Sequence, residues 1–343
     1  MDSDTALREA GEPGAVSVEA PSRLHLGFVD LNGSLGRRFG SLGLGLEGIS
    51  TRVKATRASG LRVVGPGADR VREVVQALGR AVGQDPEANI QIVKAIPSHI
   101  GLGSGTQMAL AVGMALDRLF GWGLTVHEIA EITDRGARSG MGVGAFCEGG
   151  FFVDGGKGPR ETPPPIVARA PFPDSWRLLL VFDEEGQGLH GTAEREAFEQ
   201  LPAFPEADAG HLARLVLMRI LPALREWDLD GFGRGLGELQ AVLGDYFAPA
   251  QGGRFTSPRV AGVMEWLQEQ GVTGVGQSSW GPTAFAVFGD ARQAHRFQQA
   301  VRERFRDCPS LRTEVRAAAR TGAWIREYAC GDAEAAPRQS ATF

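Results

Sequence analysis

The chain has 343 residues, with 36 lysines and arginines against 41 aspartates and glutamates, which gives a formal net charge of −5. At roughly 150 residues per domain, this length predicts about two domains with a substantial core. The sequence has no long run of basic residues, which excludes a surface that tracks a polyanion, so we expect no nucleic acid partner. An anion site in such a chain must be local, built from backbone N–H groups and single arginines.

Cysteine use and hydropathy favour a soluble, cytoplasmic protein. The three cysteines, Cys147, Cys308 and Cys330, are widely spaced and form no CxxC pair. This spacing argues against a disulfide framework and against a cysteine-based zinc site. No stretch approaches the ~18 apolar residues of a membrane span, and the acidic first residues lack the apolar part of a signal peptide. We therefore expect no membrane partner.

The first half of the chain alternates strand and helix patterns. Strands are expected where β-branched and apolar residues alternate or cluster, and helices where apolar residues recur every three or four positions. The expected strands are 15–30, 61–65 and 89–96, and the expected helices are 68–83, 104–120 and about 125–137. Residues 1–14 and 331–343 are polar and small, and we expect both to be disordered tails.

A proline-rich segment, 157–173, marks the boundary that we expect between two domains, 15–165 and 166–330. Its three consecutive prolines cannot continue a helix or a central strand. The second half then shows its own strand and helix patterns. Its expected elements are strands 177–183, 283–290 and 312–318, the last of these the final strand, and helices near 192–200, 209–225, 258–269 and 291–305. The expected fold class is α+β in both domains.

Glycine makes up 48 of the 343 residues, about twice the usual ~7%, and its most informative cluster follows an expected strand. Gly101, Gly103 and Gly105 lead into an expected helix, and Ser104 or Thr106 can cap its start. Without Cβ atoms, these glycines let backbone N–H groups approach a ligand, and the helix N-terminus favours an anion. The cluster predicts a phosphate-binding loop, although a tight turn with a glycine-assisted helix start fits the same residues.

A second glycine-rich segment, 134–150, contains Arg135, Arg138 and Ser139. These residues could bind a phosphate or could form a solvated helix end. The GMGVGA run in this segment follows a helix pattern rather than a strand, so we do not interpret it as a dinucleotide-binding motif.

A third segment, 22–48, is expected as a long glycine-rich loop between strands, and polar residues on such a loop are a common place for chemistry. Asp30 could hold Mg²⁺ or a proton, and the guanidinium of Arg37 suits a carboxylate or a phosphate. A surface hairpin with solvated arginines is the alternative. The polar residues of this segment are His25, Asp30, Asn32, Arg37 and Arg38.

The fourth segment, 272–290, places Ser278, Ser279 and Trp280 in a polar and aromatic turn before an apolar strand. An indole beside small hydroxyl groups could stack on a flat ring, and a core tryptophan is the alternative.

These segments together resemble those of a known superfamily. PSHIGLGSGTQ is similar to the second signature of the GHMP kinase superfamily, and GQSSWGPTAFAV lies where that superfamily has a C-terminal glycine-rich segment. Within it, APSRLHLGFVDLNGSLGRRFGSLGLGLE and RSGMGVGAFCEGGFFVDGG resemble the β-ribofuranosylaminobenzene 5′-phosphate synthases. The resemblance covers roughly residues 16–330 in the same order.

The resemblance implies the two-domain GHMP kinase fold, with an N-terminal domain like ribosomal protein S5 domain 2 and a ferredoxin-like C-terminal domain. It also implies an Mg²⁺-dependent enzyme of tetrahydromethanopterin biosynthesis, often a homodimer. Such an enzyme condenses phosphoribosyl pyrophosphate with 4-hydroxybenzoate or 4-aminobenzoate. The products are a β-C-riboside 5′-phosphate, CO2 and pyrophosphate.

The resemblance further implies roles for individual residues. Arg37 would bind the benzoate carboxylate, and Asp30 would bind the metal or steer the developing cation. Arg138 and Ser139 would bind the 5′-phosphate, whereas His25 is expected to be a packed strand residue. The donor pyrophosphate would lie on Gly101, Gly103, Ser104, Gly105 and Thr106, with His99 beside it and Ser104 and Thr106 near the metal, and the aromatic ring on Ser278, Ser279 and Trp280.

Two departures from the kinase pattern favour the synthase. Gly105 stands where the superfamily kinases commonly have a second serine, and Gly142 stands where they often have the aspartate that activates the acceptor. An ATP-dependent small-molecule kinase and a non-catalytic sensor of a phosphorylated metabolite are the alternatives.

Overall fold

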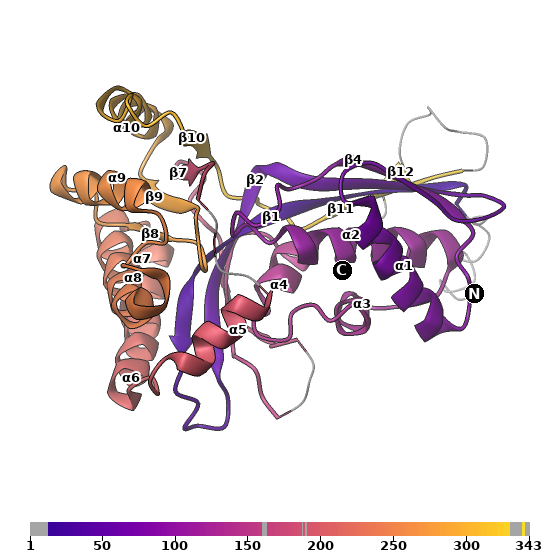
Figure 1. Cartoon of the computed structure of the whole chain (residues 1–343), viewed down its shortest axis with the longest axis horizontal. Coiled ribbons are helices and arrows are strands. Elements are labelled where there is room, and N and C mark those ends of the chain that lie inside the picture. The colour runs from indigo at the N-terminus through magenta and orange to yellow at the C-terminus, as the bar shows by residue number, and fades with distance from the viewer. Residues whose placement is uncertain (1–12, 160–162, 187, 189–190, 330–337, 340–343) are drawn as a thin grey trace.

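The computed structural model describes residues 13–159, 163–186, 188, 191–329 and 338–339. Within them the chain forms two α+β lobes that lie side by side (Figure 1). The first lobe is built on an eight-stranded sheet and the second on a four-stranded sheet. Cys330 and most of the two expected tails lie outside the described residues. None of the helices in the described ranges is long and apolar enough to cross a membrane.

The first sheet is organised around a long antiparallel hairpin of β1 (Ala15–Asp30) and β2 (Phe39–Arg57). Its strand order is β12-β11-β1-β2-β4-β3. Strand β5 pairs with the first residues of β2, and β6 pairs with β5. The remaining strands are β3 (Arg62–Val64), β4 (Ala88–Lys94), β5 (Phe151–Asp154), β6 (Ile166–Ala170), β11 (Trp324–Tyr328) and β12 (Arg338–Gln339).

Four helices cover one face of this sheet (Figure 1). Inward residues of β1, β2 and β4, which in β4 alternate with exposed ones, form one buried cluster with the apolar faces of the helices. The four helices are α1 (Ala68–Val82), α2 (Ser104–Phe120), α3 (Val126–Ile132) and α4 (Met141–Cys147). Twelve of the seventeen residues of α2 are buried, so this helix forms the centre of the lobe.

The second sheet has the antiparallel order β10-β7-β9-β8. Its strands are β7 (Arg177–Asp183), β8 (Val275–Gln277), β9 (Ala284–Phe288) and β10 (Leu311–Arg316). Its helices are α5 (Gly191–Gln200), α6 (Glu206–Leu215), the π-helical turn Val216–Ile220, α7 (Leu221–Glu226), α8 (Leu229–Gln251), α9 (Pro258–Glu269) and α10 (Ala291–Arg304). Helices α9 and α10 share a core with one face of this sheet, and α8 shares a core with the other.

The two lobes share a hydrophobic core. One buried cluster runs from the ends of β1 and β2 through β7 to α8, and it includes Leu26, Leu180 and Leu239. Gly27 in β1 has a φ of 129° and lies so close to α8 that a Cβ there would contact Leu239 and Leu243. Because apolar side chains of both lobes interdigitate in one cluster, the lobes hold each other in place.

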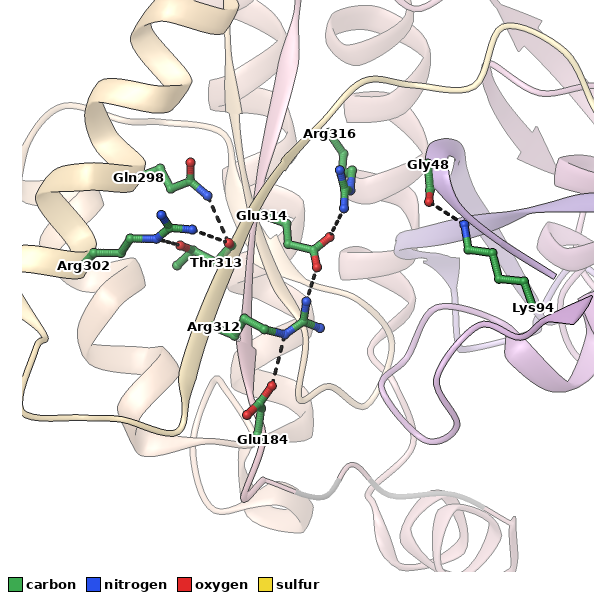
Figure 2. Close-up of polar contacts among 9 residues, drawn as sticks. All are labelled: Gly48, Lys94, Glu184, Gln298, Arg302, Arg312, Thr313, Glu314 and Arg316. Atoms are coloured by element: carbon green, nitrogen blue, oxygen red, sulfur yellow. Dashed lines mark hydrogen bonds and ion pairs between the residues drawn. The ribbon is translucent and has the colours of Figure 1, made fainter. Parts of the chain in front are cut away.

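Charged side chains pair along the edge strand β10. Arg312 contacts Glu184 at 3.1 Å and also Glu314, which in turn accepts a hydrogen bond from Arg316 (Figure 2). Paired charges on an edge strand discourage pairing with a further strand. The stem of Arg316 lies against Gly48 of the first lobe.

Most expected elements are present, with local corrections. The strands at the start of both lobes and the helix 104–120 are confirmed. Of the expected loop 22–48 only residues 31–38 connect strands, because β1 and β2 occupy the rest. The third expected helix is shorter, since α3 ends at Ile132.

Several described elements of the second half were not expected from the sequence, namely α8, β6, β8, β11 and β12. Helix α8, the longest in the described ranges, spans a stretch with several glycines. Strand 312–318 is not the final strand, because β11 follows it and pairs with β1 in the first sheet.

Strand β6 also pairs in the first sheet, so strands on both sides of position 165 belong to that sheet. The domain limits stay a prediction.

Candidate functional site

The glycine-rich loop and the first turn of α2 form an anion-binding cradle, which we define as residues 97–106. Gly101 and Gly103 have φ values of 80° and 81°, which only glycine adopts at low cost. Gly103 is the N-cap of α2 and no side chain caps the helix, so the expected cap by Ser104 or Thr106 is wrong. The N–H groups before Gln107 therefore have no partner four residues back and can bind an anion.

The carbonyl groups of the loop are held by the rest of the protein. Thr283 Oγ1 donates to Ile100 O at 2.5 Å, and Ser278 Oγ donates to Gly101 O at 2.8 Å. Ser278 Oγ also accepts the backbone N–H of His25 at 3.0 Å, which connects the loop to β1. The fully buried Ser278, expected at the aromatic ring, supports the cradle in this structure.

Arg23, which the sequence reasoning did not single out, lies against the cradle. Its Nη1 donates to Gly101 O at 2.6 Å, and its stem lies 3.1 Å from the position that a Cβ on Gly103 would take. Burial lowers the pKa of Arg23 to about 10, and the nearby Glu194 carboxylate opposes that shift. The buried Nε of Arg23 has no hydrogen-bond partner among the described residues.

Arg70 lies against the first turn of α2, and Arg135 lies close to Arg70. A Cβ on Gly105 would be 3.2 Å from Nη2 of Arg70, so this guanidinium lies against the helix start. Burial, with Arg70 close by, lowers the pKa of Arg135, and its buried Nε lacks a partner among the described residues. A cavity of about 220 Å³ opens beside Arg70, lined also by Pro97 and Ser104 among others. Neither arginine is in an ion pair within 4.0 Å in the described ranges, although the carboxylates of Asp134 and Glu73 act on Arg135 from further away.

A second hydrogen-bond network surrounds Asp154 at the end of β5. Its buried carboxylate accepts the hydroxyl of Ser41 at 2.7 Å and the N–H groups of Gly140 and Gly156 at 2.8 and 2.9 Å. Ser139 Oγ lies 2.7 Å from Ser41 Oγ and 3.3 Å from Asp154. Burial raises the pKa of Asp154 despite these bonds. Asp154 therefore fixes the segment that carries the predicted phosphate ligand Ser139.

Arg37 joins this second network, whereas Asp30 stabilises a turn. Arg37 donates from Nε to Gly155 O and from Nη2 to Gly156 O, both at 2.6 Å. Asp30 Oδ1 accepts the N–H groups of Asn32 and Gly33 at 2.8 and 2.9 Å, which shapes the tip of the β1–β2 hairpin. Their predicted contacts with carboxylate and metal stay predictions.

An ion pair lies between the cradle and the hydrogen-bond network around Asp154. Arg138 Nη1 lies 2.7 Å from Glu194 Oε1 on α5, and the same guanidinium lies over the ring of Phe198, one turn further along that helix. Glu194 interacts electrostatically with both Arg138 and Arg23, while its own burial raises its pKa. Sequence reasoning missed Glu194, because no local pattern marks a carboxylate that pairs with a distant arginine.

Trp280 belongs to the hydrophobic core that the two lobes share. It is 3% exposed and packs against Phe198 and Phe247, with ring centroids 5.3 and 4.5 Å away. Its buried Nε1 makes no hydrogen bond in the described ranges, although it lies near enough to Glu194 to lower the pKa of that carboxyl. The structure thus gives Trp280 the core packing that the sequence left as the alternative to stacking on a ligand.

The other predicted residues lie nearby. His99 and Ser279 both have positive φ values, 62° and 55°, on the loops that form and support the cradle. His25 is a packed strand residue as expected, and burial with Arg23 close by lowers its pKa to about 3. A larger cavity of about 700 Å³ lies elsewhere, over β1, β2 and β11, and contains none of the predicted residues.

Family models match both halves of the chain: "GHMP kinases N terminal domain" over residues 69–150 and "GHMP kinases C terminal" over residues 220–307. The chain is 36% identical over 282 residues to the β-ribofuranosylphenol 5′-phosphate synthase of Archaeoglobus fulgidus, covering 79% of this chain and 87% of that protein. It is 31% identical over 292 residues to the enzyme of that name from Methanothermobacter thermautotrophicus, covering 79% and 88%. A homoserine kinase of Methanopyrus kandleri is 28% identical over 268 residues, covering 74% and 83%.

Solved structures show the same fold at low sequence identity. The homoserine kinase of Cytophaga hutchinsonii matches with a TM-score of 0.63 and 17% identity, covering 91% of this chain and 97% of that chain. The mevalonate diphosphate decarboxylase of Staphylococcus aureus matches with a TM-score of 0.64 and 14% identity, covering 91% and 98%. The two-domain α+β fold expected from the resemblance is confirmed.

Proposed function

Since the chain belongs to the β-ribofuranosylphenol 5′-phosphate synthase family of the GHMP kinase superfamily, we propose that it is a pentosyltransferase of tetrahydromethanopterin biosynthesis. It condenses phosphoribosyl pyrophosphate with 4-hydroxybenzoate or 4-aminobenzoate. The products are a β-C-riboside 5′-phosphate, CO2 and pyrophosphate. The proposal includes a cytoplasmic location and a homodimer.

The observation that carries this proposal is the charge around the cradle. In a chain with a net charge of −5, Arg23 and Arg70 lie against an uncapped helix N-terminus, and Arg135 lies close to Arg70. Backbone N–H groups and guanidinium groups are the ligands that a pyrophosphate group prefers. We assign the pyrophosphate of the donor to the cradle, with Gly101, Gly103 and Gly105 leaving room for its oxygens.

The reaction breaks the bond from C1 of the ribose to pyrophosphate and forms a bond from C1 to the ring carbon that bears the carboxylate. Loss of CO2 from that carbon then restores the aromatic ring, so no net proton transfer is needed. The N–H groups of the cradle stabilise the charge that develops on the leaving pyrophosphate. Holding two anionic substrates in one orientation makes the reaction effectively unimolecular.

The second network orients the rest of both substrates. Arg138 and Ser139 bind the 5′-phosphate of the donor, and the bonds of Ser139 to Asp154 and Ser41 fix its hydroxyl. Arg37 binds the benzoate carboxylate until it leaves as CO2, and its two bonds to the backbone of Gly155 and Gly156 set its position. The aromatic ring lies toward Ser279.

The donor set suits Mg²⁺ that binds together with the substrate. Among the described residues, no group of three or more His, Cys, Asp or Glu side chains could hold a metal ion by itself. Mg²⁺ is usually bound by one or two carboxylates and by substrate phosphates, so the hydroxyls of Ser104 and Thr106 would meet it at the cradle, whereas the Asp30 carboxylate lies at the tip of the β1–β2 hairpin. When bound, Mg²⁺ neutralises charge on the leaving pyrophosphate.

One incubation tests the proposal against its alternatives. The full chain is incubated with Mg²⁺, phosphoribosyl pyrophosphate and carboxyl-labelled 4-hydroxybenzoate or 4-aminobenzoate, and labelled CO2 is counted. The synthase releases label without ATP. A kinase would consume ATP and release no label, and a sensor would bind the donor and release neither CO2 nor pyrophosphate. Either of these outcomes would reject the proposal.

A further inference from the structure

The carboxylate of Glu194 interacts with two guanidinium groups, that of Arg138 beside Ser139 and that of Arg23 at the cradle. Its Oε1 is 2.7 Å from Nη1 of Arg138, and it is the counter-charge that acts on the buried guanidinium of Arg23. The side chains of Arg138 and Glu194 are only 34% and 22% exposed, so water screens this pair incompletely. Both arginines adjoin residues that we assign to the donor.

We infer that Glu194 is an internal counter-ion that an anionic group of the donor must displace from Arg138, so that this residue sets the affinity for that group. The inference rests on the proposed function, because it takes Arg138 as a ligand of the 5′-phosphate. Before the donor binds, the carboxylate neutralises a guanidinium that would otherwise be partly buried without a partner. When the phosphate arrives, it competes with Glu194 for the same N–H donors.

The surroundings of Glu194 favour exchange over a permanent pair. Phe198 on the same helix packs against both Arg138 and Trp280, which holds α5 against the site independently of the ion pair. The groups that act on the Glu194 carboxyl come from three elements: Arg138 before α4, Arg23 on β1, and the indole of Trp280 between β8 and β9. Burial raises the pKa of Glu194, so its ionised form is less favoured than that of an exposed glutamate.

The direction in which one substitution changes the affinity for a phosphate ligand separates competition from a supporting role. Glu194→Gln keeps the size of the side chain and removes its charge, so a competing carboxylate predicts tighter binding of a phosphate ligand. A glutamate that merely orients Arg138 predicts weaker binding. The probe is ribose 5-phosphate, which carries the 5′-phosphate and lacks pyrophosphate, titrated into the full chain by calorimetry. We expect the dissociation constant of Glu194→Gln to fall by about three- to tenfold.

A matched control lies on the same helix. Glu196 is exposed on α5, and Glu196→Gln removes the same charge from the chain without removing the ion pair. We expect this variant to bind ribose 5-phosphate as the wild type does. An equal gain in both variants would show a general charge effect and would overturn the inference, as would unchanged or weaker binding by Glu194→Gln.

The pH dependence gives a second readout. Protonation of Glu194 removes the competing charge, so the ratio of wild-type to Glu194→Gln dissociation constants should decline toward one as the pH falls. The titration of the ligand itself cancels in this ratio, and a ratio that stays constant would contradict competition. If the glutamine variant fails to fold, Glu194→Asp, which withdraws the carboxylate by one methylene, should also tighten binding.

Failure of the inference is distinguishable from failure of the proposed function. Release of labelled CO2 by the wild type together with an unchanged affinity in Glu194→Gln rejects the role of Glu194 alone. No labelled CO2 and no binding of ribose 5-phosphate by the wild type rejects the proposed function.

Discussion

Arg23 on β1 donates a hydrogen bond from Nη1 to the carbonyl oxygen of Gly101 at 2.6 Å, 78 residues further along the chain. The same guanidinium is buried and interacts electrostatically with Glu194, the partner of Arg138. Arg23 therefore touches the cradle and also senses the ion pair beside Ser139. Removing this guanidinium should therefore lower the affinity for the donor more than removing a surface arginine of the same lobe.

Arg23→Met replaces this guanidinium with an apolar side chain of similar length. We expect the affinity for phosphoribosyl pyrophosphate to fall about ten- to hundredfold, because a charge-assisted contact of 1.5–3 kcal/mol is lost. Calorimetric titration measures the change. Arg52→Met, which breaks the surface pair of Arg52 with Glu19, is the control and should leave this affinity unchanged. A wild-type affinity in Arg23→Met would remove Arg23 from the donor site.

Gly101→Ala should disrupt the cradle through a steric clash. An added Cβ would lie 2.7 Å from the carbonyl oxygen of Ser278 and 3.1 Å from that of Gly281, so backbone must move. Gly36→Ala is the matched control, because Gly36 has nearly the same φ, 81°, and no atom within 4 Å of the added Cβ. Both variants carry the left-handed cost of about 1–2 kcal/mol. Only Gly101→Ala should also lower the donor affinity, as measured by titration, and equal losses would reject the clash.

Asp154→Asn tests the second network. The amide retains one acceptor but turns an N–H group toward donors such as the backbone N–H of Gly140 or Gly156. We expect the free energy of unfolding in urea to fall by about 1–3 kcal/mol and the KM for the donor to rise, since Ser139 loses its anchor. Asp69→Asn, in an exposed ion pair with Arg72, should change neither quantity appreciably. Normal stability in Asp154→Asn would contradict the anchoring role.

His25 should make the fold sensitive to acid. Its pKa in the folded chain, about 3, lies below the ordinary value of 6.5, so the folded protein keeps this ring neutral while the unfolded chain takes up a proton. The stabilisation is present above pH 6.5 and is lost as the pH falls toward 3, by up to about 1.4 kcal/mol per pH unit. His25→Asn should remove this part of the slope in urea unfolding measured from about pH 7 to pH 5. Equal slopes in the two proteins would show that His25 is protonated in the fold.

Local sequence patterns predicted most of the fold. The alternation in β1 and the apolar period of α2 lie within single segments, which is why both elements could be recognised without the structure. Helix α8 was not recognised, because its glycines lower helix propensity although apolar residues recur every three or four positions from Phe232 to Phe247. The structure explains these glycines: Gly233 and Gly237 lie against Thr273, and Gly235 lies against Ile220, where no larger side chain fits.

The candidate site was only partly predictable for the same reason. The cradle is one continuous motif, and its glycines could be recognised from spacing. Arg23, Asp154 and Glu194 acquire their roles from partners 78, 113 and 56 residues away in the chain, namely Gly101, Ser41 and Arg138. Arg23 lies within an expected strand, and nothing local distinguishes any of the three from packed or surface residues.

The central claim is that this chain joins a ribosyl donor to an aromatic acid at the cradle. The most direct test measures pyrophosphate and labelled CO2 together in one reaction of the wild-type chain with phosphoribosyl pyrophosphate, Mg²⁺ and carboxyl-labelled 4-hydroxybenzoate. We predict equal amounts of both products, each dependent on both substrates, and a strong reduction of both in Gly101→Ala but not in Gly36→Ala. Pyrophosphate release without labelled CO2, or release of neither product with either acid, would contradict the account.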